Sequence, residues 1–123
     1  MIELRSDGSV YVLINGQTFS KANSRKLVTV YGKPRVIKSL AARTWLAAAE
    51  WQVKPIEPLL EGELRVDIDI YYPSKRQDLD PSLVLDFLQG RVYENDRQVT
   101  EMHLLRHTDK ENPRTIALIS RRM

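Results

Sequence analysis

The chain has 123 residues, of which 42% are hydrophobic and 28% charged, so it fits one folded domain with a single core and not a disordered chain. It contains no cysteine, which excludes a disulfide scaffold, a thiolate nucleophile and a cysteine-ligated zinc site. No apolar run is long enough to cross a membrane and the first five residues carry no secretion signal, so we expect a cytoplasmic enzyme or binding domain.

The N-terminal segment predicts a β-hairpin followed by a loop. Two strands are expected, at Ile2–Arg5 and Ser9–Ile14, because Ser6-Asp7-Gly8 between them favours a turn. Residues 16–26 lack a hydrophobic period and are rich in polar side chains, which predicts a loop.

A second hairpin and a helix come next in the chain. Leu27–Val30 and Arg35–Lys38 are β-branched runs on either side of a turn at residues 31–34. Ser39 can cap a helix that runs from Leu40 to about Gln52, before the two prolines at positions 55 and 58.

The clearest strand in the sequence is Glu63–Tyr72, where apolar and polar residues alternate without a break. After it, Asp80 and Pro81 predict a helix start, with the aspartate as cap and the proline at the first helical position. An apolar stripe from Leu83 to Leu88 has helical spacing, and Gly90 is placed where the helix should end.

Two closing strands are expected at Thr100–His107 and Arg114–Ile119. The order of strands, helix, strand, helix and strands predicts an α+β fold, in which a mixed β-sheet carries two main helices on one face. We therefore expect residues 1–123 to form one domain.

The charges are unevenly placed, although the net charge is only +3 and the pI about 9.3. Basic residues crowd the segment from Lys21 to Lys38, which contains no acid, and Lys75-Arg76 forms a second basic pair. Acids are concentrated between Asp67 and Asp96. This distribution fits an ordinary surface with local bias, and it also fits a polyanion-binding face around an acidic pocket.

Three aspartates are candidates for a catalytic site. Asp78 and Asp80 follow the long strand and the basic pair, and Asp96 follows the second helix. Carboxylates that converge repel one another unless a divalent cation lies between them, and Mg²⁺ prefers such oxygen ligands. A cation held there can polarise a phosphate and acidify a bound water. On the pattern alone, a structural interpretation in which Asp80 only caps a helix is the simpler one.

The residues around these aspartates resemble the RusA family of Holliday junction resolvases. The similar stretches are Lys75-Arg76-Gln77-Asp78-Leu79-Asp80, Leu85-Asp86-Phe87-Leu88 and Val92-Tyr93-Glu94-Asn95-Asp96-Arg97-Gln98-Val99. The N-terminal half is similar too, at Asn23-Ser24-Arg25 and from Arg35 through Trp45. The resemblance thus extends from about Asn23 to Val99 and is strongest at the two acidic segments.

The resemblance implies a Mg²⁺-dependent (or Mn²⁺-dependent) endodeoxyribonuclease of RusA-like fold, with Asp78, Asp80 and Asp96 as metal ligands and catalytic residues. It implies a homodimer that cuts four-way or other branched DNA by paired nicks in recombination and repair. No organic cofactor and no membrane is expected. The residues expected to contact DNA are basic: Lys21, Arg25, Lys26, Lys75 and Arg76.

The sequence departs from the family pattern at three positions. Pro81 replaces the asparagine after the D-L-D triplet, and Asn95 replaces the first acid of the later pair. A lysine of the family falls on Val84. This third departure keeps one alternative open, a catalytically impaired module that binds junction DNA without cutting it. A second alternative is a protein-interaction domain whose acids are only caps and surface charge.

Several other residues are expected to have structural roles. Asp67 and Asp69 lie on the polar face of the long strand and are interpreted as its solvated side, with a secondary role near the metal pocket as the alternative. His103 and His107 share one side of a strand but have no third residue spaced to complete a zinc site.

Among the aromatic residues, Trp45 and Trp51 are expected in the core or in a dimer contact. Tyr31, in a basic turn, is the better candidate for touching DNA, with plain packing as the alternative.

Overall fold

A five-stranded mixed sheet forms the centre of the fold in a computed structural model that describes residues 1–20, 23 and 25–122. The elements are, in chain order, β1 (Ile2–Leu4), β2 (Val10–Asn15), β3 (Arg25–Val30), β4 (Lys33–Lys38), α1 (Leu40–Gln52), β5 (Leu64–Tyr72), α2 (Ser82–Leu88), the 3-10 helix η1 (Asp96–Gln98), β6 (Val99–Thr108) and β7 (Arg114–Arg121).

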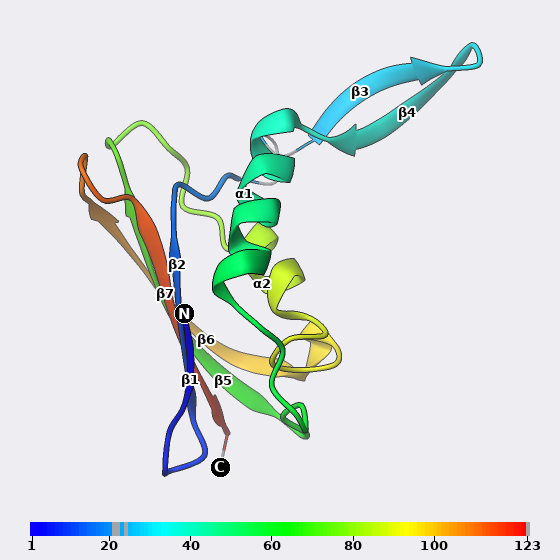
Figure 1. Cartoon of the computed structure of the whole chain (residues 1–123). Coiled ribbons are helices and arrows are strands. Elements are labelled where there is room, and N and C mark those ends of the chain that lie inside the picture. The colour runs from blue at the N-terminus through cyan, green and yellow to red at the C-terminus, as the bar shows by residue number, and fades with distance from the viewer. Residues whose placement is uncertain (21–22, 24, 123) are drawn as a thin grey trace.

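The strand order in the main sheet is β1-β2-β7-β5-β6. Only β5 and β6 are parallel, and every other neighbouring pair in this sheet is antiparallel. A parallel pair needs a crossover connection, which α2 and the loops on either side of it provide. Both helices cover the same face of the sheet (Figure 1). The expected α+β architecture is therefore confirmed.

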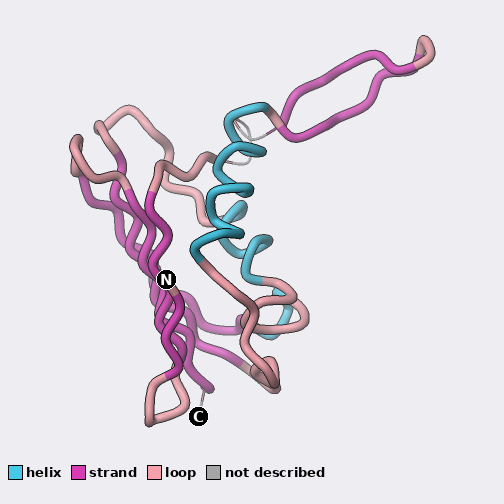
Figure 2. The backbone as a smooth tube through the Cα atoms, in the orientation of Figure 1, coloured by secondary structure: helices cyan, strands magenta, loops and turns pink. Residues whose placement is uncertain are grey.

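The core lies between this face and the helices. The alternation predicted for β5 is present, since Leu64, Val66, Ile68, Ile70 and Tyr72 are all at most 1% exposed. The residues between them point to the opposite face, which no helix covers (Figure 2).

Helix α1 starts where the sequence predicts. The hydroxyl oxygen of Ser39 accepts a hydrogen bond from the backbone N–H of Ala42 at 3.2 Å, so it caps the helix. Trp45 is buried and its ring meets that of Phe87 edge to face, with centroids 5.7 Å apart. Trp51 is 83% exposed, so it is not a core residue, and Lys54 lies over its ring. Within the described chain, no helix is long and apolar enough to span a membrane.

Helix α2 differs in detail from the prediction. It begins at Ser82, with Pro81 and not Asp80 at the cap position, and it ends at Leu88 after seven residues. The Asp80 carboxylate still accepts the N–H of Ser82 at 2.8 Å, in an Asx turn that leads into the helix. Gly90, with φ +80°, then turns the chain back, a conformation that favours glycine.

Strands β3 and β4 form a separate two-stranded sheet that projects away from the rest of the fold (Figures 1 and 2). The predicted loop at residues 16–26 was therefore too long, because Arg25 and Lys26 pair with Lys38 and Ile37 in the ladder. The turn is also shorter than expected. It consists of two residues, and Pro34 is accommodated within β4 because both strands of a hairpin are edge strands.

Candidate active site and nucleic-acid interface

The loop between β5 and α2 carries the first two predicted site residues. Asp78 is exposed and Asp80 half-buried, and the buried Tyr72 at the end of β5 holds the backbone of both. The Tyr72 hydroxyl donates to the carbonyl oxygen of Asp78 at 2.9 Å and accepts the N–H of Asp80 at 3.3 Å. One phenol thus fixes the D-L-D backbone at the end of β5.

A cation lies beside this loop. The guanidinium of Arg106, from β6, donates to the carbonyl oxygen of Gln77 and lies 5.3 Å from the centre of the Tyr72 ring. Burial has the largest effect on Tyr72 and raises its pKa. A hydrogen bond with the N–H of Asp80 and the charge of Arg106 lower this pKa, whereas the charges of Asp80 and Asp78 raise it. The Tyr72 hydroxyl therefore remains a neutral donor near neutral pH.

Sequence reasoning missed Arg106. The residue lies opposite Ile70 in the parallel ladder of β5 and β6, and this register brings it to the loop that follows β5. Nothing near Arg106 in the sequence signals its position beside this loop, because that position depends on which two strands pair.

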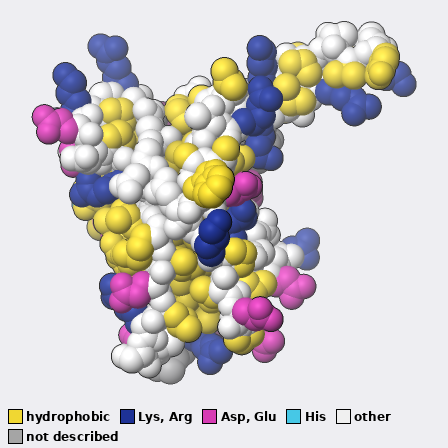
Figure 3. Space-filling model, in the orientation of Figure 1, with side chains coloured by type: hydrophobic (Ala, Val, Ile, Leu, Met, Phe, Trp, Pro, Cys, Tyr) yellow, Lys and Arg dark blue, Asp and Glu magenta, His cyan; other side chains and the backbone are white. Residues whose placement is uncertain are grey.

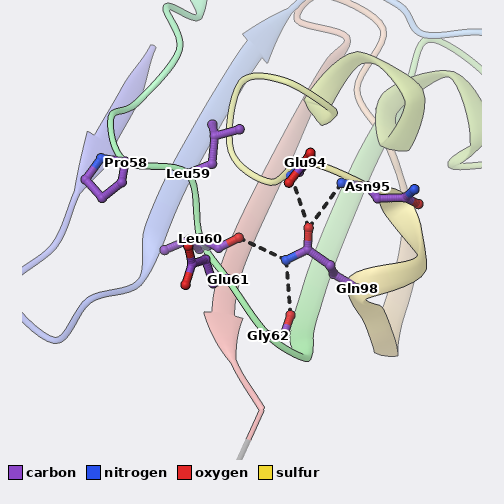
Figure 4. A pocket seen from close by; sticks show the side chains of 8 residues that line it. All are labelled: Pro58, Leu59, Leu60, Glu61, Gly62, Glu94, Asn95 and Gln98. Atoms are coloured by element: carbon purple, nitrogen blue, oxygen red, sulfur yellow. Dashed lines mark hydrogen bonds between the residues drawn. The ribbon is translucent and has the colours of Figure 1, made fainter.

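Asp96 is the first residue of η1, in the connection between α2 and β6 that forms the second loop. Its backbone N–H donates to the side-chain oxygen of Gln89 at 2.9 Å, directly after the end of α2. The side chain of Gln98 fixes the same loop (Figure 4), since its oxygen accepts the N–H groups of Glu94 and Asn95, both at 3.1 Å. Its amide nitrogen donates to the carbonyl oxygens of Leu60 and Gly62.

This loop folds back along α2. The hydroxyl of Tyr93, fully buried, donates to the carbonyl oxygen of Leu85 at 2.8 Å, near the middle of the helix. Burial raises the pKa of Tyr93 far above its usual value, and the charges of Asp96 and Asp86 raise it further. Asp96 and Asp86 thus share the surroundings of one buried phenol.

The contacts of the three predicted ligands involve two different loops. Asp78 and Asp80 flank Tyr72 at the start of α2, and Asp96 lies beside Tyr93 and Gln89 at its end. Among the residues that the structure describes, no three His, Cys, Asp or Glu side chains lie close enough together to hold one metal ion. The fit to a divalent cation is thus partial: the donors are of the right chemical type, and two of them share one loop.

The departures from the family pattern have clear structural positions. Val84 lies on the buried face of α2, has no exposed surface and packs in the core. The Asn95 side chain accepts the N–H of Arg97 at 2.9 Å and caps η1. Neither side chain is therefore available to a substrate in this structure.

The basic residues expected at DNA are exposed where the structure describes them. Lys75 and Arg76 precede the D-L-D triplet on the same loop, and Lys26 lies on β3. Lys21 lies outside the described residues, and Arg25 is described only as the first residue of β3. The loop and the hairpin both lie toward the same end of the molecule (Figure 1).

The acids and histidines on the outer face of the sheet are paired with neighbours. Asp67 accepts two hydrogen bonds from Arg65, both at 3.1 Å, and His107 lies 2.7 Å from Asp69. His103 lies 2.8 Å from Glu101. These side chains thus contact one another on the outer face of the sheet.

Tyr72→Phe should lower the free energy of unfolding by about 1–3 kcal/mol, because it leaves the Asp78 carbonyl and the Asp80 N–H without their common partner. Urea unfolding measures this change. Tyr71→Phe is the matched control, since the neighbouring hydroxyl has no hydrogen-bond partner in the described structure. Equal stability of the two variants would contradict a role for Tyr72 in holding the loop.

An exposed basic loop that carries paired carboxylates is a feature of proteins that act on phosphodiesters. Residues 17–119 match the family model described as Endodeoxyribonuclease RusA. The chain belongs to this family of endodeoxyribonucleases, as the sequence resemblance predicted. A search of curated proteins gave no match.

Proposed function

We propose that this protein is a metal-dependent endonuclease that resolves Holliday junctions and related branched DNA by paired nicks, in recombination and repair. The observation that carries the proposal is the family match over residues 17–119, which includes both acidic loops. Two symmetric cuts require two sites related by a two-fold axis, so we propose that the active form is a homodimer.

In this proposal Asp78, Asp80 and Asp96 hold Mg²⁺ or Mn²⁺. A bound divalent cation would polarise the phosphate and lower the pKa of a water bound to it. The chain's own contribution is to position the ligands. Tyr72 fixes the backbone of the first two aspartates, and Gln89 and Gln98 fix the loop of the third. Arg106 places a positive charge beside the first pair.

Lys75 and Arg76 are proposed to hold the DNA backbone next to the acidic loop. Replacing both with alanine should weaken junction binding and reduce the slope of log affinity against log salt by about 0.9 for each phosphate that the variant no longer neutralises. Fluorescence anisotropy across a salt series measures both effects.

The control for this double variant is Arg5→Ala with Lys54→Ala. It removes the same charge from the β1–β2 turn and from the segment after α1, both away from the loop between β5 and α2 (Figure 1). If the two double variants reduce the slope equally, general charge and not the loop holds the DNA.

The decisive experiment uses a synthetic immobile four-way junction. Cleavage is measured with and without Mg²⁺ or Mn²⁺, and binding is measured by gel shift in EDTA. Paired nicks that require the metal would support the proposal. A protein that does not bind the junction and does not cut it would contradict the proposal.

A second candidate function is junction binding without cleavage. The observations that favour it are the burial of Val84 and the finding that, among the described residues, no three His, Cys, Asp or Glu side chains lie close enough together to hold one metal ion. In that case the same assay gives a tight, metal-independent complex and intact strands at every metal concentration.

A further inference from the structure

The projecting hairpin β3–β4 has a basic side. Strand alternation places three cross-strand pairs on one of its faces, and each pair joins a cation to an aliphatic side chain: Lys26 with Ile37, Arg35 with Val28, and Lys33 with Val30. The aliphatic stems of lysine and arginine can lie against such neighbours and leave the charges outward. Figure 3 shows basic side chains interleaved with hydrophobic ones along the hairpin.

Among the described residues, no acidic side chain balances the charge of the hairpin. In the part of the chain that the structure describes, none of Lys26, Lys33, Arg35 and Lys38 has a carboxylate within ion-pair distance. Every residue of β4 is exposed, and residues 21–38 contain no acid. The exposed positive charge suits this arm to binding a negatively charged surface. An isolated two-stranded hairpin is at best marginally stable in water, so such a surface would also stabilise the arm.

The tip of the arm presents an aromatic ring. Tyr31 is 99% exposed and has φ +51°, and Gly32 follows with φ +75°. Two consecutive positive φ values define a type I′ turn, for which Asn-Gly is the preferred sequence. A tyrosine at the first of these positions is costly to the turn, and its ring packs against nothing, so the turn itself does not explain it.

We propose that the β3–β4 hairpin is a DNA-binding arm that follows the backbone of one duplex of a branched DNA and stacks Tyr31 on a base exposed at the branch point. The inference rests on the proposed function and names the element that reads the branch. Six residues per strand give the arm a reach of about 20 Å. A two-stranded ribbon of this kind is narrow enough to enter a major groove.

The charge of the arm favours DNA over a second copy of the chain. An apolar groove of about 480 Å³ lies beside α1 and is lined by residues such as Phe19, Leu40 and Trp45. Its lining contains no acid, so it would leave the cations of the arm unpaired. Phosphates pair with them and also leave bases free to stack on Tyr31.

The test measures binding in EDTA by fluorescence anisotropy, with an immobile four-way junction and a linear duplex of equal length. Tyr31→Asn removes the ring and supplies the residue that the turn prefers, so the hairpin is retained. Tyr31→Phe keeps the ring and is the matched control. Lys33→Gln with Arg35→Gln tests the charges, and 2-aminopurine at the branch point reports stacking.

Tyr31→Asn should weaken junction binding by about 5- to 150-fold, the range expected when one stacking interaction is removed, and leave duplex binding unchanged. The 2-aminopurine signal should change on binding of the wild type and of Tyr31→Phe, and not on binding of Tyr31→Asn. The double charge variant should weaken binding to both DNAs.

Three results would overturn the inference. If wild type binds the junction and Tyr31→Asn binds it with equal affinity, the inference is overturned and the proposed function stays intact. Wild type that binds neither DNA would overturn both. If the arm variants bind DNA normally but sediment as a smaller species than wild type, the arm holds a second copy of the chain.

Discussion

Asp80→Asn should lower cleavage of a four-way junction by more than about a hundredfold and leave junction binding intact. Substitution of a residue that only supports a metal ligand commonly lowers metal affinity or activity about 10- to 100-fold. Loss of a direct ligand is therefore expected to have a larger effect. The measurement is single-turnover cleavage at saturating Mg²⁺, with a gel shift in EDTA alongside it.

The structure indicates that this substitution is conservative for the fold. The Asp80 side-chain oxygen accepts the N–H of Ser82 at 2.8 Å, and the amide oxygen of asparagine can accept the same bond. Removal of one negative charge next to Lys75 and Arg76 does not oppose DNA binding. A loss of activity would therefore report the missing carboxylate and not an unfolded loop.

Glu63→Gln is the matched control. Glu63 is an exposed acid that directly precedes the first residue of β5, whereas Asp80 follows the last residue of this strand. Asp96→Asn extends the test to the second loop. If only the Asp80 variant is inactive, Asp96 has a structural role and the site is built on the first loop alone. Wild-type cleavage by Asp80→Asn would contradict the assignment of the metal site.

Local patterns were sufficient to predict most of the fold. Ser39 as cap, the bounds of α1 and the alternation in β5 all follow from residues close in sequence, and all are present. The projecting hairpin was located, but its length was not predicted. Arg25 and Lys26 look like loop residues until their pairing with β4 is known.

The candidate site was less predictable than the fold. The sequence located the D-L-D loop, because Asp78 and Asp80 follow a clear strand. It did not show that Tyr72 would hold this loop or that Arg106 would lie beside it, since both depend on tertiary contacts. The distance of Asp96 from the first pair depends on how the loop after Gly90 folds, which residue types alone do not specify.

The position of Val84 leads to the second large prediction. A lysine of the family falls on this residue in the sequence, yet Val84 has no exposed surface and packs within the core. Val84→Lys should therefore lower the free energy of unfolding by about 3–5 kcal/mol near neutral pH, because it buries an ammonium group away from any partner.

Val84→Met is the matched control, since methionine has similar length and flexibility but no charge. Urea unfolding of the two variants separates the cost of size from the cost of charge. The pH dependence gives an independent check. Burial places the pKa of the new lysine below its unfolded value of about 10.4, so the unfolded chain binds more protons between the two values. The lysine variant should gain stability relative to the methionine variant as the pH rises from about 7 to about 10.

The same pair of variants tests what supplies positive charge to the site. If Val84→Lys is destabilised as expected and cuts junctions no faster than Val84→Met, the core excludes a lysine at this position. Arg106, which already contacts the loop of Asp78 and Asp80, is then the cation best placed to act there. If Val84→Lys is as stable as Val84→Met and cuts faster, α2 can turn this position toward the DNA. The burial of Val84 would then describe only the protein without its substrate.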